Sequence, residues 1–275
     1  MRFSVRHETL YRYSAPVRLG RHLVRLAPRG DGATIRARRL IVEPEPIAVV
    51  EERDGFGNLV TGLEFAGETD VLRIESRFDL ETVAPASWND VEVAPLPWPV
   101  GDHAALRRSI PEGGEDPVRA FAEAIATAAG GRLDVFLDRL NTALHERTHH
   151  HIRGGGGAQA PEVTLATAAG ACRDTAVLFI DAARALGIPA RFVSGYQARA
   201  ETADGGRHLH AWPEVEIPGV GWRGFDPTHG LSVEDGHVAL AAAPEQTGTM
   251  PIEGGFWGSG VTSRLDYTVE IDADG

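Results

Sequence analysis

Alternation of apolar and polar residues dominates residues 1 to 92 of the chain. The stretch RFSVRHETLYRYS alternates with period two, and RRLIVEPEP, NLVTGLEFAG and VLRIESRFDLETV follow at short spacing, with RDGFGN and AGETD as turns. Short strands with regular turns predict a sandwich-like all-β module. The Pro-rich, aromatic stretch APASWNDVEVAPLPWPVGD follows, so we predict that this module spans residues 1–95.

Helical spacing replaces alternation after that boundary. DPVRAFAEAIATAAGG begins with Asp116 as N-cap and Pro117 in the first turn, and it ends at Gly130. RLDVFLDRLNTALHERTHHHI carries a second helix, and its consecutive histidines, 149–151, are expected at the helix end, near the negative pole of the dipole. Its apolar face is predicted to contain Leu133, Phe136, Leu137, Leu140 and Leu144.

A third helix carries the only cysteine of the chain, after a glycine-rich loop at residues 154–157. Its stop signal is RALGIPA, with Arg184 in the last turn, Gly187 after it and Pro189 beyond. One apolar stripe on this helix is formed by Cys172, Ala176, Phe179, Ile180, Ala183 and Leu186. The spacing therefore places Cys172 at the N-terminal end of the stripe.

The remainder of the chain returns to strands. ARFVSGYQA is followed by the turn ETADGG, HLHAWPEVEI and GWRGFDPT are predicted to pair around PGVG, and SRLDYTVEI is a last strand. The order β, then α, then β predicts an α+β fold. We expect a core over residues 96–240 and a C-terminal extension over residues 241–275.

Composition narrows the class of protein. Hydrophobic residues make up 43% of 275 residues, with no run long enough to span a membrane. The polar, alternating N-terminus does not resemble a signal peptide, and one cysteine excludes an intrachain disulfide, so we expect a cytoplasmic protein. A net charge of −12 argues against nucleic-acid or anionic-membrane partners and favours cationic or amine-bearing ones. The sequence does not indicate an oligomeric state.

The position of Cys172 suggests chemistry. A thiol at a helix N-terminus faces unpaired backbone N–H groups and the positive end of the dipole, which favours the nucleophilic thiolate. The same N–H groups can stabilise an oxyanion. The alternative is a buried cysteine that packs as a small hydrophobic residue.

Two residues on the predicted hairpin complete a candidate triad. If the strands pair around Pro218 and Gly219, facing residue numbers sum to about 437, so His210 and Asp226 are expected within one position of each other. Cys172 would attack a carbonyl carbon, His210 would move the proton, and Asp226 would orient His210. Singly, His210 could be a half-buried strand histidine and Asp226 a turn residue before Pro227.

These motifs resemble the transglutaminase-like superfamily. GACRDTAVLFIDAARALGIPARFVSGY, HAWPEV and GWRGFDPTHG match its core, while RHETLYRYSAPVRLGRHLVRLAPR and DGFGNLV are similar to the N-terminal region of its bacterial members. The resemblance implies a papain-like core, in which the helix bearing the cysteine packs on an antiparallel sheet, and the triad Cys172, His210 and Asp226. It departs at Thr175, where the family has an aromatic residue, which implies a different cleft wall.

Further cleft residues are less strongly indicated. Trp212 and His208 each lie two positions from His210 on its predicted strand. Gln159 or a side chain near His151 is a candidate for the oxyanion hole. His149, His150 and His151 diverge on a helix, so we expect no metal site and no cofactor. Arg173 and Asp174 follow Cys172 directly. We expect the charge of Arg173 to favour the thiolate and that of Asp174 to oppose it.

A cysteine triad forms a thioester with a peptide or carboxamide carbonyl. Water as acceptor gives a cysteine-protease-like hydrolysis, and an amine gives transamidation, so the partners are a peptide or protein substrate and, for transamidation, an amine acceptor. The chain contains no lysine, which would prevent an amine-joining enzyme from modifying itself, although codon usage explains this more simply. Two other readings are an inactive scaffold that binds a partner protein and a redox sensor built on one reactive cysteine.

Overall fold

The computed structural model describes residues 1–88, 91–99, 104–108, 114–199 and 206–274. Within them lie four α-helices, two short 3₁₀ segments (Ala104–Leu106 and Gln246–Thr249) and sixteen strands. The helices are α1 (Pro117–Ala128), α2 (Leu133–Arg147), α3 (Pro161–Thr167) and α4 (Cys172–Ala185). The strands are β1 (Arg2–Leu19), β2 (His22–Val24), β3 (Ala33–Glu43), β4 (Ala48–Arg53), β5 (Leu59–Glu64), β6 (Thr69–Thr82), β7 (His149–His150), β8 (Ala169–Gly170), β9 (Ala190–Gln197), β10 (His210–Ile217), β11 (Gly221–Asp226), β12 (Leu231–Ser232), β13 (His237–Ala243), β14 (Ile252–Glu253), β15 (Phe256–Trp257) and β16 (Ser263–Asp274).

The N-terminal region is built from two antiparallel sheets, as its alternation predicts. One sheet has the order β15-β1-β6-β3 with β16 also on β1, and the other has the order β14-β2-β5-β4. Along β1, buried residues occur at every second position, from Phe3 and Val5 to His7 and Thr9. The expected β-rich module is therefore confirmed, although its sheets also recruit strands from the C-terminal end of the chain.

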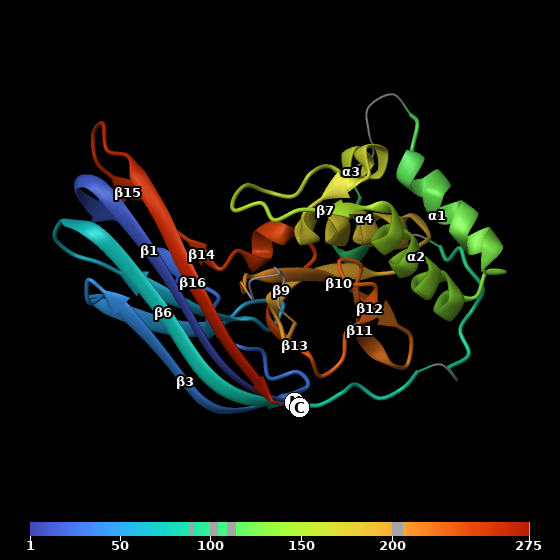
Figure 1. Cartoon of the computed structure of the whole chain (residues 1–275), viewed down its shortest axis with the longest axis horizontal. Coiled ribbons are helices and arrows are strands. Elements are labelled where there is room, and N and C mark those ends of the chain that lie inside the picture. Colours follow the sequence, from blue (N-terminus) through green and yellow to red (C-terminus); the bar gives the residue numbers. More distant parts are fainter. Residues whose placement is uncertain (89–90, 100–103, 109–113, 200–205, 275) are drawn as a thin grey trace.

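The last strand closes the N-terminal sheet. β16 pairs with β1 from Arg2↔Asp274 to Tyr13↔Ser263, so the two ends of the chain lie side by side (Figure 1). The sequence predicts this strand but not its partner, because alternation carries no information about pairing between segments so far apart. The expected domain limits at residues 95 and 240 stay predictions.

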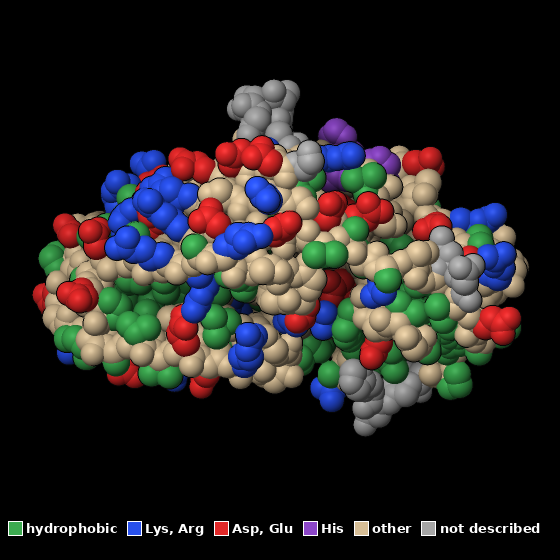
Figure 2. Space-filling model, turned by 90° about the horizontal axis from the view of Figure 1, so that it is seen from below, with side chains coloured by type: hydrophobic (Ala, Val, Ile, Leu, Met, Phe, Trp, Pro, Cys, Tyr) green, Lys and Arg blue, Asp and Glu red, His purple; other side chains and the backbone are tan. Residues whose placement is uncertain are grey.

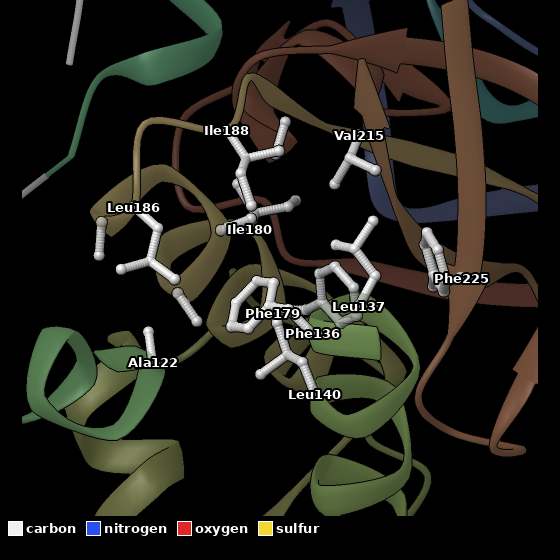
Figure 3. Packing of buried hydrophobic residues seen from close by; sticks show 14 of the residues in the cluster. Ala122, Phe136, Leu137, Leu140, Phe179, Ile180, Leu186, Ile188, Val215 and Phe225 are labelled. Atoms are coloured by element: carbon white, nitrogen blue, oxygen red, sulfur yellow. The ribbon is translucent and has the colours of Figure 1, made fainter. Parts of the chain in front are cut away.

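The core consists of helices packed on a second antiparallel sheet, which confirms the α+β expectation. The order of this sheet is β12-β11-β10-β9-β13, and α4 lies against β10 and β9. Phe179 of α4 and Phe225 of β11 stack with ring centroids 5.4 Å apart, beside Leu137 and Leu140 of α2 (Figure 3). This apolar layer fixes α4, and with it Cys172, relative to the hairpin.

The helix signals are largely confirmed. The Asp116 side chain accepts a hydrogen bond from the Arg119 backbone N–H at the start of α1, and the predicted apolar face of α2 is buried. The expectation that α2 runs through residues 149–151 is wrong, because it ends at Arg147 and the next residues form β7, which pairs in parallel with β8. The short helix α3 is not predicted, and the turn ETADGG lies mostly outside the described residues.

The core sheet and the N-terminal sheets share a hydrophobic cluster. Tyr196 of β9 with Val238 and Leu240 of β13 pack among residues of β1, β2, β5 and β6. The buried Tyr196 hydroxyl lies 2.6 Å from Nδ1 of His7 on β1. The core sheet is thus covered by α4 on one face and by the β-rich region on the other, so the two regions hold a fixed relative position.

Candidate active site

Cys172 is the first residue of α4 and is partly exposed. Its helix is held by buried apolar residues on one side and by Asp174 at its start. The buried Asp174 carboxylate accepts hydrogen bonds from the backbone N–H of Ala171 at 2.7 Å and of Gln159 at 2.8 Å. Because Asp174 ties both preceding segments to the first turn, the thiol has a defined position at the N-terminus of the helix.

His210 opens β10 and is 1% exposed. It lies opposite Gly195 of β9, and a Cβ atom at Gly195 would come within 2.6 Å of Cη2 of Trp212. The missing side chain therefore admits the Trp212 ring, which stacks beside His210 with centroids 6.1 Å apart and 30° between the planes. The indole shields the imidazole from water.

Asp226 ends β11 and meets His210 directly. Nε2 of His210 lies 2.8 Å from Oδ2 of Asp226, and both side chains are fully buried. The observed register is Glu214↔Gly224 to Ile217↔Gly221, so facing numbers sum to 438 rather than the predicted 437. Continued, this register places Asp226 opposite Trp212, and His210 is its diagonal neighbour on the same face, within reach for long side chains.

Two further histidines bind the same carboxylate oxygen. Oδ2 of Asp226 lies 2.9 Å from Nδ1 of His229 and 3.1 Å from Nε2 of His237, while Oδ1 accepts backbone N–H groups of Thr228 and His229. The sequence motifs assign no role to His229 or His237. The signal for His229, a histidine three residues after Asp226, is too common to identify a partner.

The charges and hydrogen bonds of this cluster favour the protonated form of His210. Burial lowers the pKa of His210, but the charge and hydrogen bond of Asp226 outweigh burial, and the Cys172 thiol adds to them, so the pKa is raised well above 6.5. Burial opposes ionisation of Asp226, but His210, with His229 and His237, holds its pKa well below 3.8. Burial lowers the pKa of His237, so that ring is a neutral donor.

Cys172 and His210 line the same cleft, which has a volume of about 650 Å³ and lies between the core and the N-terminal sheet. Because Nε2 of His210 is bound to Asp226, Nδ1 is the ring nitrogen left to exchange a proton with the thiol. The far wall includes Leu265 and Tyr267 of β16. The structure therefore places Cys172 and His210 at one solvent-accessible cleft, with Asp226 buried and hydrogen-bonded to His210.

The other predicted cleft residues have different positions. His208 lines the cleft, and its Nδ1 lies 2.8 Å from the Tyr267 hydroxyl. Trp212 is fully buried behind His210 and does not line the cleft. The Gln159 side chain also lies outside the cleft lining and donates to the Ala169 carbonyl, and Thr175 is buried with its hydroxyl on the Cys172 carbonyl.

His150 is a site neighbour that the sequence assigns to a helix end. It faces the cleft from β7, and burial, with the nearby His145 and His229, lowers its pKa to about 4. Neither of its ring nitrogens has a hydrogen-bond partner among the described residues. It is therefore a neutral imidazole beside the strand that leads to Cys172.

Donor atoms for a metal exist within the site, because ligand atoms of His210, Asp226 and His229 lie within 4.8 Å of one another. Those atoms already bond to each other, with the carboxylate accepting from both rings. A metal there would take the nitrogen and oxygen atoms that form the His–Asp pair, so the donor set fits proton transfer better than coordination. The expectation of a metal-free site stays a prediction.

Family models match two regions of the chain. Residues 3–81 match the bacterial transglutaminase-like N-terminal region, and residues 119–227, which include all three triad positions, match the transglutaminase-like superfamily core. The chain belongs to the transglutaminase-like superfamily. The matches follow the chain order of the β-rich region and the core, and the second contains both strands of the hairpin.

Relatives of this transglutaminase-like chain share its full length. An uncharacterised protein of Mycobacterium tuberculosis is 28% identical over 291 residues, covering 98% of this chain and 92% of the relative. One from Mycobacterium leprae is 26% identical over 297 residues, covering 98% of both. The structure of a proposed cysteine protease from Cytophaga hutchinsonii shares the fold, with a TM-score of 0.72 at 20% identity over 100% of this chain and 92% of that one.

Proposed function

We propose that this protein is a Cys-His-Asp acyl-transfer enzyme that acts on peptide or glutamine-type carboxamide bonds through a thioester. The observation that carries the proposal is the fully buried His210–Asp226 hydrogen bond of 2.8 Å at the same cleft as the Cys172 thiol. Membership of the transglutaminase-like superfamily supports the same chemistry. In this superfamily core the three residues occur in the order nucleophile, base, acid.

The proposed reaction has two balanced halves. In the first half, the Cys172 thiol proton passes to Nδ1 of His210, the sulfur attacks the carbonyl carbon, and the C–N bond breaks as His210 returns the proton to the leaving amine. The thioester is then attacked by water or an amine, whose proton passes to His210 and finally to the departing Cys172 sulfur. Asp226 stabilises the imidazolium in both halves.

Backbone N–H groups at the start of α4 are the proposed donors to the oxyanion. The first N–H groups of a helix have no partner within the helix, and Cys172 is the first residue of α4. A tetrahedral oxygen formed at the thiol lies next to these groups. The Gln159 side chain, one of the two candidates for this role, instead donates to the Ala169 carbonyl, which argues against it.

Hydrolysis and transamidation use the same triad and differ only in the acceptor. A cleft of about 650 Å³ has room for a peptide segment together with water or a small amine. We propose a cytoplasmic location as well, where reducing conditions keep a lone cysteine as the free thiol. No helix among the described residues is long and apolar enough to cross a membrane.

The proposal is tested by the rate of Cys172 alkylation by iodoacetamide as a function of pH. The wild-type protein is expected to react fast well below pH 8, because His210 receives the thiol proton, and the His210→Ala variant is expected to lose that reaction. His149→Ala, at an exposed histidine outside the site, is the control and should behave as wild type.

Slow alkylation with a midpoint near the ~8.5 of a free thiol in all three proteins would contradict the proposal. It would favour the partner-binding scaffold instead. Fast reaction that is insensitive to His210 would favour a redox sensor, whose thiol reacts with peroxide without a histidine base.

A further inference from the structure

The charge of the cleft differs from that of the whole chain. The protein carries a net charge of −12, yet no Asp or Glu is among the described residues that line the cleft. Two arginines, Arg153 and Arg173, lie on its wall beside Cys172. The net negative charge of the whole chain favours a cationic acceptor, but the charged residues on this wall of the cleft are arginines. The wall itself therefore does not favour a cationic acceptor.

Most arginines elsewhere have carboxylate partners. On the face shown in Figure 2, arginine and carboxylate side chains intermingle over the β-rich half of the molecule. Examples are the ion pairs Arg12–Asp266, Arg36–Glu81 and Arg38–Glu51. Arg153 also has a partner, because it binds Asp174 at 2.8 Å.

Arg173 is different. Among the described residues no carboxylate forms an ion pair of 4.0 Å or less with its guanidinium, and the positive charge of Arg153 acts on it. Nη2 donates to the carbonyls of Arg153 and Gly155 at 2.9 and 2.6 Å, whereas Nη1 and Nε donate to no group of the described residues. Burial, and then the charge of Arg153, lowers the pKa of Arg173.

A half-buried guanidinium with no carboxylate in contact is costly, because it loses hydration and gains no direct ion pair. Arg153 and Arg173 share one buried carboxylate, Asp174, which binds Arg153 directly, and the thiolate form of Cys172 is a further anion that acts on Arg173. Arg173 therefore lines the cleft with no carboxylate in direct contact among the described residues. A ligand carboxylate would form the direct ion pair that Arg173 lacks and accept the hydrogen bonds from Nη1. Arginine presents donors in a planar fork that matches a carboxylate better than it matches a neutral group.

We propose that Arg173 forms a subsite for a carboxylate carried by the acyl substrate close to the reactive carbonyl. The proposal rests on the proposed function, since it places this carboxylate next to the Cys172 nucleophile. Arg173 follows Cys172 directly and lines the same cleft, so a carboxylate on Arg173 holds the substrate within reach of the thiol. The carboxylate is either an Asp or Glu side chain or the free C-terminus of a short peptide.

The test compares two alkylating reagents that differ only in charge. Iodoacetate carries a carboxylate and iodoacetamide does not, so the ratio of their rates with Cys172, divided by the same ratio with glutathione, reports carboxylate recognition. We expect the normalised ratio of the iodoacetate rate to the iodoacetamide rate to be about ten in the wild type. It should fall to about one in Arg173→Gln and be intermediate in Arg173→Lys. Added salt should lower it.

Arg119→Gln, at an exposed arginine of α1, is the matched control and should keep the wild-type ratio. The iodoacetamide rate in each variant is an internal check on folding and on the thiol. If Arg173 only positions the loop or stabilises the thiolate, both reagents will slow equally in Arg173→Gln and the ratio will not change, which overturns the subsite. If iodoacetamide itself reacts slowly with wild type at every pH, the proposed nucleophile fails and the subsite fails with it.

Protection experiments distinguish the two sources of the carboxylate. Acetyl-Ala-Glu-amide carries the charge on a side chain, acetyl-Ala-Ala carries it at the C-terminus, and acetyl-Ala-Ala-amide is neutral. Slower iodoacetamide alkylation with one charged peptide, but not with the neutral one or in Arg173→Gln, identifies the source. Equal protection by all three would contradict carboxylate recognition.

Discussion

The Asp226 carboxylate accepts five hydrogen bonds, three from histidine rings and two from backbone N–H groups. The ionised carboxylate has about four lone-pair sites and no proton of its own, so the three rings share Oδ2 and the two backbone N–H groups share Oδ1. The backbone bonds fix the turn after β11, and the ring bonds orient His210. In the proposed mechanism Asp226 therefore acts on Cys172 through His210.

Asp226→Asn should lower the reactivity of Cys172 while the chain stays folded. The amide has one acceptor oxygen, and its NH₂ group faces ring N–H donors, so the imidazolium loses its counter-charge. We expect iodoacetamide alkylation at pH 7 to slow by about tenfold or more, which corresponds to about 1.4 kcal/mol of lost stabilisation. Stopped-flow or mass-spectrometric alkylation rates measure this, with Asp266→Asn on the exposed face of β16 as control.

An unchanged rate in Asp226→Asn would show that His210 does not depend on this carboxylate. That result would also remove the reason to treat the His210–Asp226 contact as part of the catalytic machinery. A rate lost together with the far-ultraviolet circular dichroism signal would instead report unfolding, so both are recorded on the same samples.

At the scale of elements, the site depends on how closely β9, β10 and β13 approach. Gly195 of β9 faces His210, and a Cβ there would lie 2.1 Å from the Val238 carbonyl oxygen of β13. The neighbouring backbone cannot move away without breaking the β9–β13 pairing. A glycine is therefore required for packing at this position, with no need for an unusual φ angle.

Gly195→Ala should destabilise the protein and disturb the His210–Trp212 stack. Overpacking a rigid site typically costs about 1–3 kcal/mol, and contact with backbone places this change at the upper end. Urea unfolding followed by Trp fluorescence measures the loss. Gly236→Ala is the matched control, since a Cβ there meets nothing closer than 4.0 Å; equal stability of the two variants would contradict the packing argument.

At the scale of the whole molecule, the β-rich region and the core form one continuous structure. β16, from the C-terminal end, completes the N-terminal sheet and supplies a wall of the cleft. His7 of β1 and Tyr196 of β9 join the two regions through a buried hydrogen bond of 2.6 Å. The cleft therefore needs both ends of the chain to be in place.

A fall in pH should weaken the contact between His7 and Tyr196 that links the two regions. Burial lowers the pKa of His7 to about 4 from 6.5, so between these values the unfolded chain binds a proton that the folded chain does not. The stability contribution of neutral His7 is complete above pH 6.5 and is lost as the pH falls towards 4, by up to about 3 kcal/mol. His7→Gln should lessen this acid dependence in urea unfolding from pH 7 to 4.

His149→Gln serves as the control for this measurement, because the side chain is exposed. Other buried histidines, such as His150, add to the acid sensitivity, so the wild-type slope should be reduced in His7→Gln and not abolished. An identical slope in His7→Gln and wild type would mean that His7 titrates in the folded protein as it does in the unfolded chain.

Local patterns in the sequence determined the elements of this protein. The period-two alternation gave the strands of the β-rich region, and the apolar spacing gave α1, α2 and α4 with Cys172 at its helix start, since these features depend on neighbours a few residues apart. The His–Asp pair could be predicted because a short hairpin joins its strands. The residue numbers that face each other across this hairpin sum to 438 instead of the predicted 437. The side chains of His210 and Asp226 still meet, because they are diagonal neighbours on one face of the sheet.

Tertiary structure decided the features that depend on distant segments. These features are the β1–β16 pairing, the hydrogen bond of His237 to Asp226, the burial of Trp212 and the position of Arg173 on the cleft wall without an ion pair to the described residues. Each depends on parts of the chain that local periodicity does not relate. Pairing of distant strands and the burial of single side chains result from packing of the whole chain, which buries apolar surface wherever complementary faces meet. The sequence thus determined which residues form the candidate triad, and the folded chain determined the shape and charge of the cleft around them.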